Sequence, residues 1–123
     1  MPDSSKTVVV VIEDLFFTVK IADAAKRAGA RTVFVKTADA AFDSLREKPI
    51  LMVVDLNCAG IDPIELILRI KASEYRDVPV VGFVSHVQVD LRQRAQEAGY
   101  DTVVARSAFS SNLPDILRRY TDL

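Results

Sequence analysis

The chain has 123 residues, of which 50% are hydrophobic and 27% are charged, a size and balance typical of one folded domain. Sixteen basic and seventeen acidic residues give a formal net charge of −1, and without a basic stripe we expect no nucleic-acid partner. No apolar run approaches the roughly 20 residues that cross a bilayer, so we expect no membrane partner either. The single cysteine, Cys58, cannot form an internal disulfide. We therefore expect residues 1–123 to be one domain in the cytoplasm.

Apolar runs and helical patterns alternate along the chain. Runs typical of parallel strands covered on both faces lie at 8–12, 32–35, 50–54 and 78–84, with a weaker one at 102–105. Segments with a helical spacing of apolar residues lie between and after them, at 15–28, 38–45, 63–72, 87–98 and 113–120. In the third helix, Ile64, Ile67 and Leu68 are expected to form the buried face. The alternation predicts an α/β fold with (βα)5 units in a doubly wound parallel sheet.

Polar side chains follow the ends of these predicted strands. Glu13 and Asp14 follow the first, Asp55 the third, Ser85 the fourth and Arg106 the fifth, so all should meet at one edge of the sheet. Three neighbouring carboxylates raise one another's pKa unless a cation neutralises them, and Mg²⁺ takes oxygen ligands of this kind. A hydroxyl and a fixed cation suit the oxygens of a phosphoryl group. We predict that Asp55 is a rigidly held nucleophile or metal ligand.

This ordered set resembles the receiver domains of two-component response regulators, over residues 8–120. The resemblance implies a flavodoxin-like sheet with the strand order 2-1-3-4-5, in a signalling module that is not itself an enzyme. Asp55 would accept a phosphoryl group from a sensor histidine kinase or a phosphotransfer protein, which would bind near helix 1. The surface of helix 4, strand 5 and helix 5 would then contact a downstream effector protein or output domain. A homodimer through this surface is a further expectation, with Arg118 and Arg119 as partners for Asp101.

The same resemblance implies roles for the individual polar residues. Asp14, Asp55 and the backbone carbonyl of Asn57 would hold Mg²⁺, with Glu13 acting through water. Ser85 would hydrogen-bond an oxygen of the phosphoryl group.

The chain differs from the family pattern at several positions, among them the loop NCAGIDP (57–63) after Asp55, where the family tends to have a proline at Ala59 and a glycine at Pro63. Arg106-Ser107 stand in place of the usual Lys-Pro, and we predict that the planar guanidinium of Arg106 binds the phosphoryl oxygens bidentately. Val103 replaces the aromatic residue that changes rotamer in many receivers. Val87, two residues beyond Ser85, is apolar at a position that helps to place the hydrolytic water, so we expect slow loss of the phosphoryl group.

Several of these residues also fit simpler structural roles. Glu13 and Asp14 are typical of a cap at the start of a helix, whose dipole favours acidic groups. His86, the only histidine, is expected to be a solvent-facing loop residue rather than a catalytic base. Arg106 could form a permanent ion pair with Asp55 in place of a bound phosphoryl group.

Two alternative functions follow from these observations. A pseudo-receiver of the same fold would bind proteins without being phosphorylated, held in one state by Arg106 and without a ring at Val103. A small α/β enzyme is the third class. The segment IEDLFFTV (12–19) after the first strand is acidic and bulky, and it lacks the glycine-rich phosphate loop that a nucleotide-binding enzyme needs there.

Overall fold

The structure of the protein, a computed structural model, describes residues 6–85 and 88–122. Its strands are Thr7–Val11 (β1), Arg31–Val35 (β2), Leu51–Asp55 (β3), Val80–Val84 (β4) and Thr102–Ala105 (β5). Its helices are Leu15–Arg27 (α1), Ala38–Ser44 (α2), Pro63–Lys71 (α3), Val89–Ala98 (α4), Arg106–Ser111 (α5) and Leu113–Thr121 (α6), with a 3-10 turn at Leu45–Glu47 (η1). Within these two ranges, no helix combines the length and the apolar character that crossing a membrane requires.

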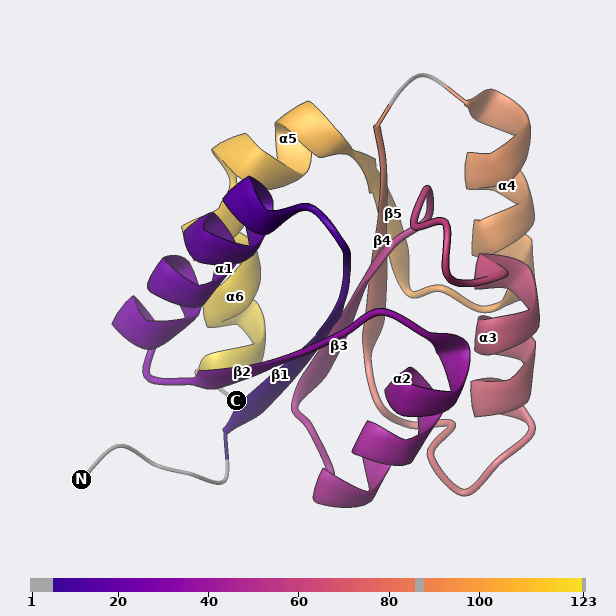
Figure 1. Cartoon of the computed structure of the whole chain (residues 1–123), viewed down its shortest axis with the longest axis horizontal. Coiled ribbons are helices and arrows are strands. Elements are labelled where there is room, and N and C mark those ends of the chain that lie inside the picture. The colour runs from indigo at the N-terminus through magenta and orange to yellow at the C-terminus, as the bar shows by residue number, and fades with distance from the viewer. Residues whose placement is uncertain (1–5, 86–87, 123) are drawn as a thin grey trace.

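The five strands form one parallel sheet in the order β2-β1-β3-β4-β5 (Figure 1). This confirms the predicted flavodoxin-like topology and its strand order. The order reverses between β1 and β3, which lie side by side although a helix, a strand and another helix separate them in the chain. Ligands of such sheets bind beyond the carboxyl ends of the strands at this reversal, and Asp14 and Asp55 lie there.

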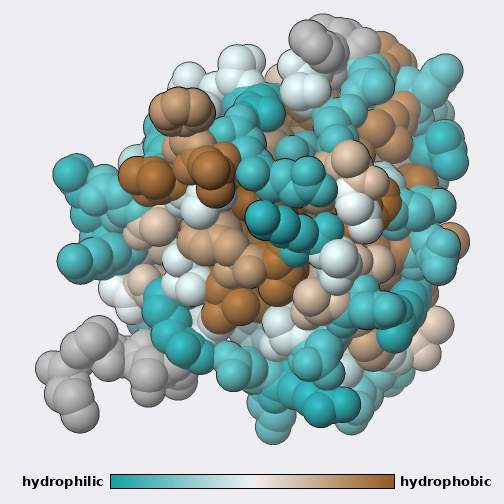
Figure 2. Space-filling view, in the orientation of Figure 1, coloured by the Kyte–Doolittle hydropathy of each residue, from teal (hydrophilic) through white to brown (hydrophobic). Residues whose placement is uncertain are grey.

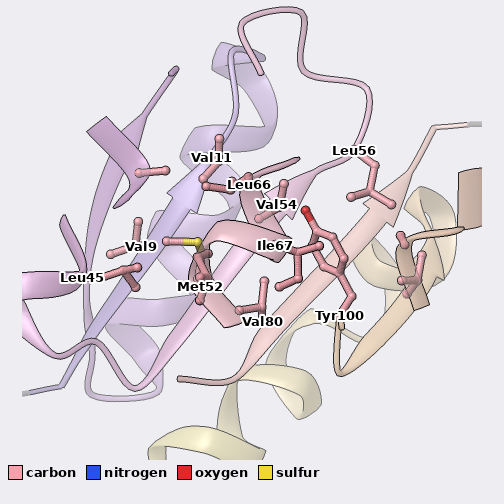
Figure 3. Packing of buried hydrophobic residues seen from close by; sticks show 14 of the residues in the cluster. Val9, Val11, Leu45, Met52, Val54, Leu56, Leu66, Ile67, Val80 and Tyr100 are labelled. Atoms are coloured by element: carbon pink, nitrogen blue, oxygen red, sulfur yellow. The ribbon is translucent and has the colours of Figure 1, made fainter. Parts of the chain in front are cut away.

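Helices cover both faces of the sheet and bury alternate residues of each strand. Val8 and Val10 of β1 belong to a core with α1, α5 and α6, whereas Val9 and Val11 belong to one with α2, α3 and α4. Figure 3 shows Val9 and Val11 on the second face, which the side chain of Ile67 also lines. All residues of the central strands β1, β3 and β4 are buried, as expected for parallel strands between two helical layers.

The buried face of α3 differs from the predicted one. Leu66, Ile67 and Ile70 are buried, whereas Leu68 is 53% exposed, so the prediction was wrong for Leu68. Residues i, i+1 and i+4 of a helix lie within one face, and one further residue turns by about 100°. Ile70 points in a direction between those of Leu66 and Ile67, so Leu68 points away from the sheet and Ile64 is only partly buried.

The segment directly after β5 is helical, ahead of the helix predicted at 113–120. Helix α5 begins directly at Arg106, after an extended Ala105. Its serine-rich sequence has little intrinsic helix preference, but Phe109 is fully buried, with its ring 5.8 Å from Phe17 and 4.9 Å from Phe83 between centroids. Tertiary packing of this one side chain therefore outweighs the local preference.

Candidate functional site

Asp55 is the last residue of β3, and only 6% of it is exposed. Its Oδ1 accepts a hydrogen bond from the backbone N–H of Asn57 at 2.9 Å. Burial raises the pKa of Asp55; the hydrogen bond from Asn57 and the charge of Arg106 oppose this, and the charges of Asp14 and Glu13 add to it. The central strand thus holds a carboxylate in a place that disfavours its charge unless a cation is near.

Asp14 is the N-cap of α1 and accepts a hydrogen bond from the backbone N–H of Phe17 at 3.1 Å. Its second oxygen, Oδ2, forms an ion pair with Nη2 of Arg106. The hydrogen bond from Phe17 has the largest effect and lowers the pKa of Asp14. Burial raises this pKa by less, and the hydrogen bond and charge of Arg106 lower it further. Asp14 therefore has the capping role expected for an acid at a helix start and also faces the site.

Arg106 lies over an aromatic surface at the start of α5. The carbon at the centre of its guanidinium is 4.7 Å from the ring centroid of Phe17 and 5.9 Å from that of Phe83. The ion pair that we had considered with Asp55 is formed with Asp14 instead. Position explains the difference, because Asp14 and Phe17 are on the first turn of α1 and the guanidinium meets both at once.

Ser85 and Asn57 are bound to each other. The backbone N–H and the hydroxyl of Ser85 both donate to Oδ1 of Asn57, at 2.8 and 3.0 Å. The amide of Asn57 in turn donates to Oε1 of Gln88 at 2.6 Å. The side chain of Asn57 therefore joins the loop after β3 to the loop after β4, and the hydroxyl that we expected to face a phosphoryl group has a partner within the protein.

Glu13 turns toward the loop that follows β3. The thiol of Cys58 is 3.8 Å from Oε1 of Glu13, and a Cβ atom added at Gly60 would be 3.3 Å from the same oxygen. Cys58 is buried, and burial raises the pKa of its thiol. His86 and Val87, for which we predicted a loop histidine and an effect on hydrolysis, lie outside the described residues.

The carboxylates of Asp14 and Asp55 are the candidate ligands for a divalent cation. In the part of the chain that the structure describes, no three acidic, histidine or cysteine side chains converge closely enough to hold a metal ion. Mg²⁺ needs only one or two carboxylates, because waters and phosphate oxygens complete its shell. Asp14 and Asp55 fit that requirement by chemistry, although Arg106 now contacts the free oxygen of Asp14.

A groove of about 620 Å³ opens beside these residues, between α1 and α5. Its lining includes Lys20, Ser85, Arg106 and Ser107. Sequence reasoning missed the apolar rim: Leu15, Phe16 and Val19 are 72%, 91% and 69% exposed, and Figure 2 shows brown side chains gathered at this end of α1. The signal was present, because these three residues fall outside the helical face of Phe17, Ile21 and Ala25.

A larger groove lies elsewhere on the described part of the chain. It measures about 790 Å³ and lies around Phe42, Arg69 and Tyr75, between α2 and the end of α3. None of the predicted site residues lines it, so its size does not make it the functional site.

Neither a family model nor a curated protein sequence matches the chain. Solved structures match it over nearly its whole length. A response regulator from Thermotoga maritima is 25% identical, with a TM-score of 0.78 over 96% of this chain and 98% of that one. The receiver domain of a Pseudomonas aeruginosa sensor histidine kinase, with a magnesium ion in its active-site cleft, has a TM-score of 0.82 at 20% identity, over 96% and 98% of the two chains. The chain has the receiver-domain fold.

A third receiver structure extends the comparison to a phosphorylated form. A cyanobacterial phytochrome response regulator, solved with its phosphoryl group, has a TM-score of 0.78 at 22% identity, over 93% of this chain and 89% of that one. On the receiver fold of the present chain, Asp14 and Asp55 lie at the reversal of strand order. The likeness to these structures is one of fold, and the contacts of Asp14, Asp55, Ser85 and Arg106 described above are those of this chain.

Proposed function

We propose that the protein is a phosphorylatable receiver of a two-component system, in which Asp55 is the phosphoacceptor. The observation that carries this proposal is a buried carboxylate at the carboxyl end of the central strand β3, in the company of Asp14, on the receiver fold. A buried carboxylate is costly to keep. A role as the phosphoacceptor would explain why the carboxylate of Asp55 is kept in this buried position.

The proposed reaction exchanges one bond to phosphorus for another. Oδ1 of Asp55 is occupied by the N–H of Asn57, so Oδ2 is the nucleophile. It attacks phosphorus of a donor phosphohistidine, an O–P bond forms as the N–P bond breaks, and the imidazole nitrogen leaves with the electron pair of that bond. Arg106 and the hydroxyl of Ser85 would then turn to the transferred oxygens, leaving their present partners.

Asp14, Asp55 and the carbonyl of Asn57 would hold Mg²⁺. When bound, the cation would neutralise charge that develops on the phosphoryl oxygens. The mutual repulsion of Asp14 and Asp55 is the physical reason for the chain to take up a cation here.

The exposed apolar rim of α1 is the proposed contact for the phosphodonor, a sensor histidine kinase or phosphotransfer protein of the cytoplasm. Phe16 lines the groove that reaches Arg106, and Leu15 and Val19 are exposed on the same helix. Exposed apolar patches of this kind often mark protein contacts. We place the effector contact on α4, β5 and the helices after it, which also carry Arg118, Arg119 and Asp101 for the proposed homodimer.

The experiment is intact-protein mass after incubation with Mg²⁺ and a small-molecule phosphodonor. The parent should gain one phosphoryl group, and an Asp55→Asn variant should gain none. An Asp39→Asn variant should behave like the parent, because Asp39 is exposed and pairs with Arg69. No adduct on the folded parent would contradict the proposal.

A pseudo-receiver is the second candidate, favoured by one observation. Both groups expected to bind the phosphoryl oxygens are paired within the protein, Arg106 with Asp14 and Ser85 with Asn57. A protein that stayed in this state would act by contact alone. Absence of both phosphorylation and cation binding would favour this second function.

A further inference from the structure

The guanidinium of Arg106 is fixed from two sides. Nη2 contacts Oδ2 of Asp14, and the group lies 4.7 Å from the Phe17 ring centroid, within the range of a cation–π contact. Phe17 itself packs on Phe83 at 5.2 Å and on Phe109 at 5.8 Å between ring centroids. The Phe17 ring beneath the guanidinium is therefore held in place by the buried core.

Asp14 is fixed as well. Its Oδ1 is the cap of α1, bound to the N–H of Phe17, which leaves Oδ2 as the oxygen that points to Arg106. Arg106 is the first residue of α5, so the helix start sets the origin of its side chain. The ion pair between Asp14 and Arg106 joins the starts of α1 and α5. Each helix is held by its own packing, so the two charged groups are in contact before any ligand binds.

We propose that Arg106 is a built-in counter-ion that competes with the divalent cation for Asp14, so that cation binding requires the guanidinium to leave. This rests on the proposed function only in taking Asp14 as a cation ligand. A guanidinium and a divalent ion that share one carboxylate oxygen repel each other, so each lowers the affinity of the other for Asp14. The positive charge that Asp55 needs nearby is thus supplied before any metal binds.

The competition has a consequence for signalling. Cation binding would release Arg106 from Asp14 and make it free to reach a phosphoryl group, so the two events become coupled through one side chain. The chain would bind the cation weakly for a receiver, and substitution of Arg106 would strengthen binding rather than weaken it. A residue that only held the fold together would show the opposite effect.

The test is calorimetric titration of metal-depleted protein with Mg²⁺ alone. Arg106→Gln should bind Mg²⁺ roughly tenfold more tightly than the parent, within the usual size of coupling between two sites. Arg69→Gln is the matched control, because Arg69 also pairs with an aspartate, Asp39 at 3.0 Å, and lies 4.2 Å over the ring centroid of Phe42. Its affinity should equal that of the parent.

Equal or weaker Mg²⁺ binding by Arg106→Gln would overturn the proposal. If that variant fails to fold, the parent alone decides, by the side-chain N–H resonance of Arg106 during a Mg²⁺ titration. The resonance should shift in proportion to occupancy of the site, and an unchanged resonance at saturation would overturn the proposal. No phosphodonor is present, so a protein that binds Mg²⁺ as expected but is not phosphorylated would contradict the proposed function and leave this inference standing.

Discussion

The hydroxyl of Ser85 donates to Oδ1 of Asn57 at 3.0 Å, so the loops after β4 and β3 are joined across the carboxyl edge of the sheet. The same oxygen accepts the backbone N–H of Ser85 at 2.8 Å. The hydroxyl is the more easily redirected of the two donors, because it rotates about one bond while the backbone contact keeps the loop in place. Ser85 can thus be held near Asp55 and still change its partner.

Ser85→Ala should slow phosphorylation of Asp55 by about tenfold, the loss expected for one hydrogen bond to a charged group. The backbone contact to Asn57 remains, so the free energy of unfolding should change by less than about 1 kcal/mol. The rate of adduct formation by mass spectrometry and urea unfolding measure the two effects. Ser73→Ala is the control, because the hydroxyl of Ser73 donates to the backbone carbonyl of Ile70, near the end of α3. An equal loss of rate in Ser73→Ala would contradict a specific role for Ser85.

Asp55→Asn should stabilise the protein at pH 7 in a chelating, metal-free buffer, by on the order of 1 kcal/mol. Burial raises the pKa of Asp55 in the folded state above the model value of 3.8. The folded state therefore binds the proton more tightly, and stability falls as pH rises from the unfolded-state pKa through the folded-state pKa. Above that window the cost is fully present; below the unfolded-state pKa it is absent.

The gain from Asp55→Asn should accordingly disappear as the pH is lowered toward 3.8 and below, as urea unfolding at several pH values would show. Asp14→Asn is the companion variant with the opposite sign. The pKa of Asp14 is lowered by the cap bond from Phe17 and by Arg106, so its charge stabilises the folded state above the unfolded-state pKa. A stabilised Asp14→Asn at pH 7 would contradict the contacts described for that residue.

Gly60→Ala should be strongly destabilising, by about 2–3 kcal/mol. A Cβ atom there would lie 2.2 Å from the backbone carbonyl oxygen of Lys36, so the loop after β3 or the start of α2 must move. Gly29→Ala isolates the backbone effect, because its φ is +84° and a Cβ atom would meet nothing within 4 Å; it should cost about 1 kcal/mol. Urea unfolding compares them, and equal losses would contradict the close approach at Gly60.

Tyr100→Phe should lower the free energy of unfolding by about 1 kcal/mol. The hydroxyl of Tyr100 donates to the carbonyl of Pro63 at 2.9 Å, at the start of α3, and burial raises the pKa of this phenol. Figure 3 shows the ring beside Ile67 in the core. Tyr120→Phe is the comparison, because Tyr120 is only partly buried. Thermal and urea unfolding should show a larger loss of stability for Tyr100→Phe than for Tyr120→Phe. An unchanged free energy of unfolding in Tyr100→Phe would contradict the hydrogen bond.

The sequence predicted the sheet and the place of Asp55 because both depend on local pattern. An apolar run that ends on an acid is visible without any tertiary information, and the order of such runs determines which ends meet. The partner of Arg106 could not be predicted in this way. Asp14 is 92 residues away, and the contact depends on α5 starting at Arg106, which in turn depends on the burial of Phe109.

The exposure of Leu68 illustrates the same limit. Successive side chains of a helix point about 100° apart, so two adjacent residues cannot both point to the centre of the core. Ile67 and Leu68 are both apolar, and the sequence alone does not say which of them is buried. Packing against the sheet decides between them. At Phe16 and Phe17 the helical spacing is more informative, because Phe17 shares a face with Ile21 and Ala25, and the structure buries Phe17 and exposes Phe16.

Finding the residue that carries the phosphoryl group decides whether Asp55 is the phosphoacceptor. The parent protein is incubated with Mg²⁺ and a small-molecule phosphodonor, the acyl phosphate is reduced with borohydride, and the modified position is found by peptide mass mapping. We expect reduction at Asp55 alone. Reduction at Asp14, Glu13 or another carboxylate, or none in protein that remains folded, would contradict it.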